Sequence, residues 1–231
     1  MIKLTDEAPQ GADLSGDQHR RLIGWIGLFL PLILIGLALE RDGLKTWSRL
    51  ESISAYYYSG AVTVFVGMLV SLALFLFTYR GYKNDYHKWD RTTAIIAGFA
   101  ALIVALFPTA APKHLPVLAW WRPWTGELHH AGAIVLFAMF AVFALWLFRI
   151  DKDGKPQMTR PRDRIYFACG LVIVGCILWA GYNGFRSAPI FWPEAIALIA
   201  FSISWLVKGY ADEKVVSVAR SMLRSGSKPP G

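Results

Sequence analysis

Six long apolar stretches dominate this 231-residue chain, and each is long enough to cross a membrane as a helix. A membrane-spanning helix needs about 17–25 mostly apolar residues to cross a hydrocarbon core of roughly 30 Å. Only helices and closed barrels satisfy the backbone in lipid, and these stretches are too long and too uniformly apolar for barrel strands. We therefore predict an all-α, polytopic integral membrane protein with a single bundle of six transmembrane helices. The predicted spans are residues 22–39, 61–79, 92–108, 128–148, 165–182 and 190–207.

The overall composition agrees with a membrane protein. Hydrophobic residues make up 55% of the chain and charged residues only 17%, whereas soluble domains have about 25% charged residues. A net charge of +8 would favour a nucleic-acid partner in a soluble protein. Here the basic residues follow the predicted spans, so we expect membrane lipids as partners and no nucleic acid.

Lysine and arginine alternate between the segments that join the spans. The N-terminal segment, the second and fourth loops and the C-terminal tail hold 18 of the 24. Short basic loops stay in the cytoplasm, and an even number of spans puts both termini on one side. We therefore predict cytoplasmic N- and C-termini, with the first span kept as an uncleaved anchor. The expected location is the inner (plasma) membrane of a bacterium.

This topology divides the chain into three parts. Residues 1–19 form a polar cytoplasmic tail, residues 20–207 the six-helix bundle, and residues 208–231 a basic cytoplasmic tail. Cys169 and Cys176 lie two helical turns apart in one predicted span. A regular helix keeps such residues too far apart for a disulfide, so we interpret both as packing residues.

The first group of candidate functional residues precedes the second span. If residues 51–59 are helical, Glu51, Ser54 and Tyr58 share one face. Glu51 and Ser54 are then candidate catalytic residues, and Tyr58 is a candidate for substrate binding. An alternative is purely structural, with Glu51 in a capping box with Ser48 and the tyrosines as interfacial anchors.

The second group opens the fourth span and contains Glu127, His129 and His130. Ionisable side chains at a membrane edge are candidates for function, and histidine suits general acid–base work. The two histidines point about 100° apart on a helix, so both cannot point equally well into one site. We take both as catalytic candidates and Glu127 as a substrate-binding candidate. The spacing matches no metal-binding motif, and we expect no metal or cofactor.

The third group surrounds the fifth loop and contains Asn183, Arg186 and Glu194, all candidates for substrate binding. Arg186 suits a phosphate or carboxylate headgroup. The alternatives are an interfacial arginine and an acid that favours the first turn of a helix. The third loop adds a tryptophan cluster, which we interpret as an anchor in the outer interface.

Several short strings carry a resemblance to a known family. An Ile-Ser pair precedes the second span, Phe107-Pro108 closes the third, and His129-His130 opens the fourth. With six spans, this resembles the damage-regulated autophagy modulator (DRAM-like) family and related bacterial membrane proteins, over roughly residues 20–205. The resemblance implies a six-helix bundle, with Ser54, Pro108, His129 and His130 at the matching positions. Some eukaryotic relatives are associated with lipid or lipid-anchor remodelling, whereas the bacterial ones lack an assigned activity.

Three functions follow from these patterns. The first is a lipid-modifying enzyme or lipid-binding protein with its site at the outer membrane interface, where most candidate residues converge. The second is a structural or partner-binding membrane protein without chemistry. The third is a small transporter of a hydrophobic substrate, which the scarcity of polar residues at mid-span disfavours. Residue types alone do not decide between an enzyme and a binding protein.

Overall fold

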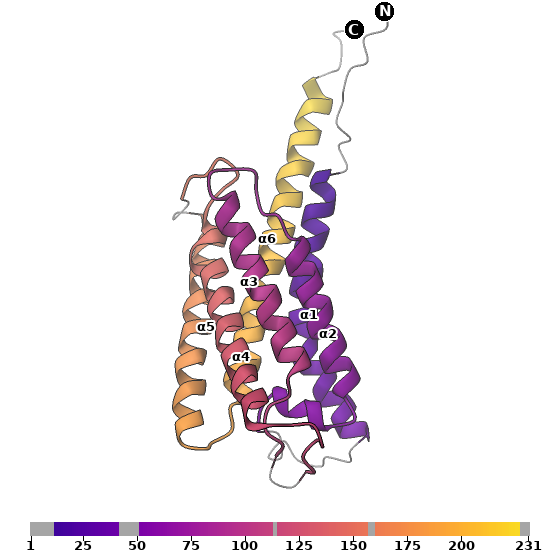
Figure 1. Cartoon of the computed structure of the whole chain (residues 1–231). Helices are drawn as coiled ribbons and strands as arrows, with labels where there is room; N and C mark the ends of the chain where they lie inside the picture. Colours follow the sequence, from indigo (N-terminus) through magenta and orange to yellow (C-terminus); the bar gives the residue numbers. More distant parts are fainter. Residues whose placement is uncertain (1–11, 42–50, 113–114, 157–159, 227–231) are drawn as a thin grey trace, which may run out of the picture.

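A computed structural model describes residues 12–41, 51–112, 115–156 and 160–226, and the regular structure there is helical apart from one isolated bridge between Ile150 and Pro156. Six α-helices account for most of it, and Figure 1 shows their arrangement. They are α1 (Ala12–Arg41), α2 (Val62–Thr78), α3 (His87–Leu106), α4 (Pro123–Leu145), α5 (Pro161–Phe185) and α6 (Phe191–Gly226). Two 3₁₀-helices, η2 (Ser54–Tyr58) and η3 (Leu147–Arg149), lie in the connections.

The helices form a closed bundle in chain order. Each packs against its neighbours in the sequence, and α6 closes the bundle by packing along α1 (Figure 1). A contact between α4 and α6 crosses the interior. The start of α1 and the end of α6 therefore lie at the same end of the molecule.

Five of the described helices are long and apolar enough to cross a membrane. The shorter helix is α2, whose 17 residues span about 25 Å at the rise of an α-helix. The prediction of an all-α protein with membrane-length helices is confirmed. That α2 makes a sixth crossing stays a prediction.

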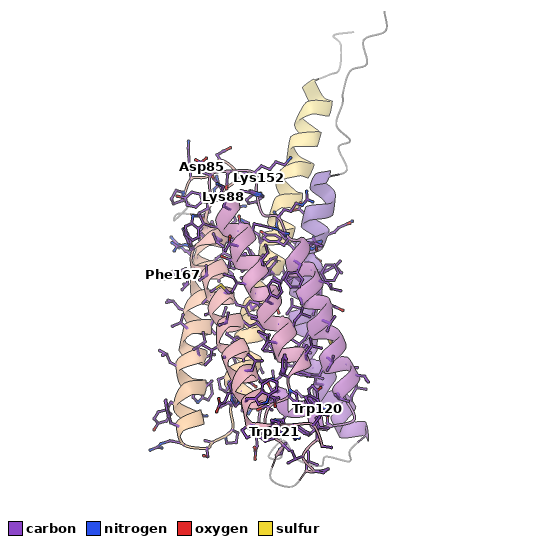
Figure 2. All side chains as sticks on the ribbon, in the orientation of Figure 1. Asp85, Lys88, Trp120, Trp121, Lys152 and Phe167 are labelled. Atoms are coloured by element: carbon purple, nitrogen blue, oxygen red, sulfur yellow. The ribbon has the colours of Figure 1, made fainter. Side chains whose placement is uncertain are left out.

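The two ends of the bundle differ in their side chains. Figure 2 shows Asp85, Lys88 and Lys152 at the end where α1 begins, and Trp120 and Trp121 at the opposite end. We call these the basic end and the tryptophan end. The second and fourth loops, predicted from their charge to share one side, both lie at the basic end.

Helices α1 and α6 extend beyond the apolar runs that predicted them. Helix α1 begins at Ala12, within the predicted polar tail, and α6 continues to Gly226, through most of the predicted basic tail. Once a helix is nucleated, each further residue adds a hydrogen bond, so polar residues can continue it. Residues 1–11 and 227–231 of these tails, and Ser48 of the predicted capping box, lie outside the described residues.

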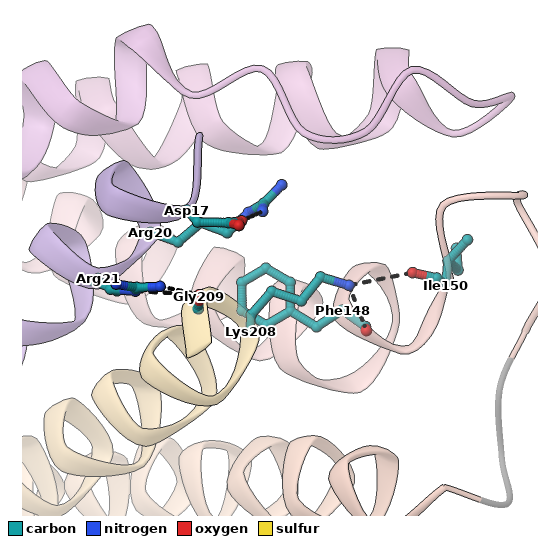
Figure 3. Close-up of polar contacts among 7 residues, drawn as sticks. All are labelled: Asp17, Arg20, Arg21, Phe148, Ile150, Lys208 and Gly209. Atoms are coloured by element: carbon teal, nitrogen blue, oxygen red, sulfur yellow. Dashed lines mark hydrogen bonds and ion pairs between the residues drawn. The ribbon is translucent and has the colours of Figure 1, made fainter. Parts of the chain in front are cut away.

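Charged side chains at the basic end make internal contacts, one between elements and one within α1. The Lys208 ammonium on α6 donates hydrogen bonds to the carbonyl oxygens of Phe148 (3.0 Å) and Ile150 (3.3 Å) (Figure 3). On α1, the buried Arg20 guanidinium pairs with Asp17 at 2.6 Å. Some basic residues that signal topology in the sequence are therefore also structural.

Glycines allow neighbouring helices to approach closely. A Cβ at Gly24 on α1 would lie 2.7 Å from the Leu206 side chain on α6. A Cβ at Gly132 on α4 would lie 2.7 Å from the Ile103 side chain on α3. Small residues at helix interfaces are typical of membrane bundles, where van der Waals packing replaces the hydrophobic effect between helices.

This packing gives a test of stability. Gly132→Leu is expected to force α3 and α4 apart and to destabilise the protein by about 1–3 kcal/mol, as overpacking does in well-packed cores. The measurement is thermal unfolding of the purified protein in detergent. The control is Gly175→Leu on α5, because a Cβ at Gly175 meets no atom within 4 Å. Equal unfolding temperatures for the two variants would contradict this account of the packing.

Candidate functional site

A cavity of about 390 Å³ lies between α4, α5 and α6 at the tryptophan end. Its volume is within the usual range for small-molecule sites, about 300–1,000 Å³. Most of its wall is apolar and is made by helical side chains. Polar groups gather where the 3₁₀-helix η2 and the first turn of α6 close it. The polar lining consists of Ser52, Ser54, Thr109, His129, His130 and Glu194.

Residues 51–58, which we call the 51–58 segment, are fixed to the start of α6 by backbone groups. The Glu51 carbonyl accepts hydrogen bonds from the amides of Ile190 (2.7 Å) and Phe191 (3.1 Å). In return, the Ile53 amide donates to the Glu194 carboxylate at 2.6 Å. This short hydrogen bond and the two bonds to the Glu51 carbonyl join the segment and α6 into one unit.

Two tyrosines hold the same segment against the bundle. Tyr56 is fully buried and packs against Phe191, and burial raises the pKa of its phenol above the ordinary value. The Tyr58 hydroxyl donates to the carbonyl of Thr109 at 2.7 Å. Burial, with the neighbouring Tyr57, also raises the pKa of Tyr58. These phenols are therefore neutral packing and bridging groups, and Tyr58 is outside the cavity lining.

The central feature of the cavity is a hydrogen bond between Ser54 and His129. The Ser54 hydroxyl lies 2.7 Å from His129 Nε2, and His129 Nδ1 lies 2.6 Å from the carbonyl oxygen of Phe107. A carbonyl can only accept, so Nδ1 carries the proton and donates. In the neutral ring Nε2 is then the acceptor, and the Ser54 hydroxyl donates to it.

The Phe107 carbonyl is available because the chain leaves the helix there. Phe107 caps α3 with extended backbone angles, φ −108° and ψ 111°. The residue before a proline is disfavoured in the helical region, so Pro108 promotes this break. The carbonyl turns away from the helix ladder and accepts the His129 proton.

The neighbouring His130 lies at the rim of the same cavity. His129 is 1% exposed, whereas His130 is exposed and its Nε2 lies 3.2 Å from the Thr109 hydroxyl. The sequence predicted that the two rings cannot point equally into one site. In the structure both rings line the cavity, the buried His129 inside and the exposed His130 at the rim.

Other predicted site residues lie outside the cavity lining. The side chains of Glu51 and Glu127 are exposed. Asn183 donates from Nδ2 to the carbonyl of Pro189 at 2.8 Å and so stabilises the turn between α5 and α6. The exposed Arg186 guanidinium lies over the Tyr182 ring, 4.9 Å from its centre. Glu51 contributes only its backbone carbonyl to the contact with α6, and a backbone contact cannot be predicted from residue type.

Sequence reasoning missed several lining residues. Ser52 lies two positions before Ser54, and Thr109 follows the Phe-Pro break; both positions are visible signals beside the predicted candidates. On α5, Cys176, Ala180 and Gly184 repeat at four-residue spacing and form one small-residue face. The four-residue spacing is visible in the sequence and could have indicated that this face of α5 lines the cavity.

An aromatic stack limits the depth of the cavity. Phe137 on α4 and Ala197 on α6 belong to the lining. About one helical turn deeper on the same helices, the fully buried rings of Phe140 and Phe201 stack on each other. Because these rings fill the interior, the cavity ends within the bundle.

Within the described residues, no group of three or more His, Cys, Asp or Glu side chains is arranged to hold a metal ion. Comparison with protein-family models, curated proteins and solved structures gives no match for this chain. Membership of the DRAM-like family therefore stays a prediction from the short strings that carry the resemblance.

The bond between Glu194 and Ile53 predicts a loss of stability. Glu194→Ala removes the acceptor of a part-buried amide, which is expected to cost about 1–3 kcal/mol. Glu194→Gln keeps an acceptor oxygen and is expected to cost less. Thermal unfolding in detergent measures both, with the exposed Glu127→Ala as control. If Glu194→Ala unfolds like the Glu127 variant, the bond does not hold the segment.

Proposed function

We propose that this protein binds an amphiphilic lipid in the cavity at the tryptophan end. The acyl chain lies along the apolar wall, and the headgroup meets Ser54, His129 and Glu194. The observation that carries the proposal is the cavity itself, in which an apolar wall ends in a cluster of hydrogen-bonding groups. An amphiphile has the same division between chain and headgroup.

The lipid would reach the cavity through the α5 side. Gly181 and Gly184 line the cavity and are exposed, and a Cβ added at either glycine would meet no atom within 4 Å. The rest of α5 exposes large apolar residues such as Leu178 and Trp179, as expected of a helix that faces lipid. A chain in the surrounding bilayer can thus enter laterally, without passing through water.

The charge of the lining favours a neutral or cationic headgroup. Glu194 is an acid, and no lysine or arginine is among the described residues that line the cavity. A phosphate beside a carboxylate in an apolar site lacks a compensating charge and would be costly to bury. Hydroxyl or amine groups can donate to Glu194 and to the serine and histidine acceptors. The anionic ligand that the sequence associates with Arg186 is therefore not part of this proposal.

We also propose six membrane crossings with both termini in the cytoplasm. In that orientation the cavity faces the outer leaflet of a bacterial inner membrane. The gathering of the basic second and fourth loops at one end supports this, since basic loops stay cytoplasmic. The aromatic floor at Phe140 and Phe201 favours binding over passage through the bundle.

Filling the open wall of the cavity tests lipid binding. Gly181→Leu and Gly184→Leu are expected to weaken binding of a long-chain alkylamine at least about tenfold, since each occupies volume that the chain needs. Gly175→Leu on the same helix is the matched control, because Gly175 is also exposed and open but outside the lining. Calorimetric titration in detergent measures the affinity. Equal binding by all three variants would refute the site.

Headgroup preference gives a separate result. The alkylamine is expected to bind at least about tenfold more tightly than the alkyl phosphate of the same chain length, and Glu194→Gln is expected to reduce this preference. A preference for the phosphate would contradict the proposed headgroup class.

Labelling from one side tests the orientation. Val117 lies three residues before Trp120, which marks the tryptophan end in Figure 2, and Asp85 lies at the basic end; both positions are exposed, and each is replaced by cysteine. In intact cells, a membrane-impermeant maleimide is expected to label the first and not the second. The background replaces Cys169 and Cys176 with alanine, and permeabilised cells show that both sites react. The reverse pattern would place the cavity on the cytoplasmic side.

A further inference from the structure

We infer that Ser54 and His129 form a nucleophile–base pair that transfers the acyl group of an ester or amide bound in the cavity. This inference rests on the proposed lipid site and adds a reaction to it. The Ser54 hydroxyl donates to His129 Nε2 over 2.7 Å. A serine is activated when a base lies within about 2.6–3.2 Å and is itself oriented by a third group.

The third group here is a backbone carbonyl. The Phe107 oxygen accepts the proton of His129 Nδ1 at 2.6 Å and so fixes the tautomer whose Nε2 lone pair faces Ser54. In serine hydrolases a carboxylate fills this position and also stabilises the imidazolium that forms. A carbonyl gives orientation with only a partial negative charge. We therefore expect a slow acyl-transfer site.

The pair lies where the reacting bond of a lipid would be. Ser54 and His129 both belong to the lining, and Ser54 follows Ile53, whose amide donates to the Glu194 carboxyl group. In an acylated amphiphile, the ester or amide joins the acyl chain to the headgroup. A chain along the wall and a headgroup at Glu194 therefore bring the carbonyl carbon of the ligand to Ser54.

The reaction has two balanced steps. Ser54 Oγ attacks the carbonyl carbon and passes its proton to His129 Nε2, forming a new carbon–oxygen bond. The bond to the headgroup oxygen or nitrogen breaks, and this leaving group takes the proton from His129. A water molecule then attacks the acyl-serine with His129 again as base, which releases a fatty acid and restores Ser54.

One neighbouring hydroxyl can stabilise the negative oxygen that develops on the carbonyl. Ser52 Oγ accepts the Ala55 amide at 3.0 Å, which leaves its own O–H as a donor, and Ser52 belongs to the cavity lining. Donors aimed at the developing charge are a large part of acyl-transfer catalysis. In this assignment Ser52 is a donor to the substrate.

Covalent labelling of the full-length protein tests the pair directly. The purified protein in detergent is treated with a long-chain alkyl fluorophosphonate, and peptide mass spectrometry locates the adduct. The adduct is expected on Ser54 and absent from Ser54→Ala. His129→Gln is expected to slow labelling about 100-fold or more, the usual contribution of a general base. Ser202→Ala is the control, since Ser202 is a buried serine bonded to its own helix at the Leu198 carbonyl.

The outcomes separate this inference from the lipid site. If the wild-type protein binds the alkylamine but gains no adduct on Ser54, or gains one elsewhere, the acyl-transfer pair is wrong and the lipid site stands. If neither the amine nor the fluorophosphonate binds, both fail. The adduct site is mapped on wild-type protein, so the result does not depend on whether Ser54→Ala folds. A normal labelling rate in His129→Gln would exclude His129 as the base.

Discussion

Close approach between helices is the constraint on which the cavity depends. Gly132 lets α4 lie against α3 at Ile103. Gly132 is about one turn after His129 on α4, and Ile103 is about one turn before Phe107 on α3. Because the helices touch there, the Phe107 carbonyl comes within hydrogen-bonding distance of the His129 ring. A bulkier residue would separate the two partners, so the packing glycine and the polar site are parts of one arrangement.

The 51–58 segment closes the tryptophan end, and the same contacts build the site. Its backbone bonds to α6 through Glu51 and Ile53, and Tyr58 bonds to the Thr109 carbonyl in the loop after α3. Ser54 then faces α4 as the remaining polar link. A connection between two apolar helices must satisfy its backbone groups when it is buried, and here side chains and helix ends provide the partners. Closure of the bundle thus orders the hydroxyl that we assign to chemistry.

The two ends of the molecule use polar residues differently. At the basic end, Lys208 joins α6 to the segment that follows α4, and Arg21 on α1 donates to the Gly209 carbonyl on α6. At the tryptophan end, hydroxyls, imidazoles and one carboxylate face a cavity with an apolar wall on α5. No lysine or arginine is among the described residues of that lining, so an anion there would lack a compensating charge. The proposed ligand class follows from this difference.

Hydropathy by itself determined the helical class and the approximate position of the helices, because apolar length is a local property that lipid acts on directly. Residue type also indicated Ser54, His129 and Glu194 as polar groups at one end. The sequence did not pair Ser54 with His129, 75 residues apart, or connect Ile53 with Glu194. Nor did it separate these residues from Glu127 and Arg186. Those distinctions depend on which helices are neighbours and on the rotation of each about its axis, and only tertiary packing decides both.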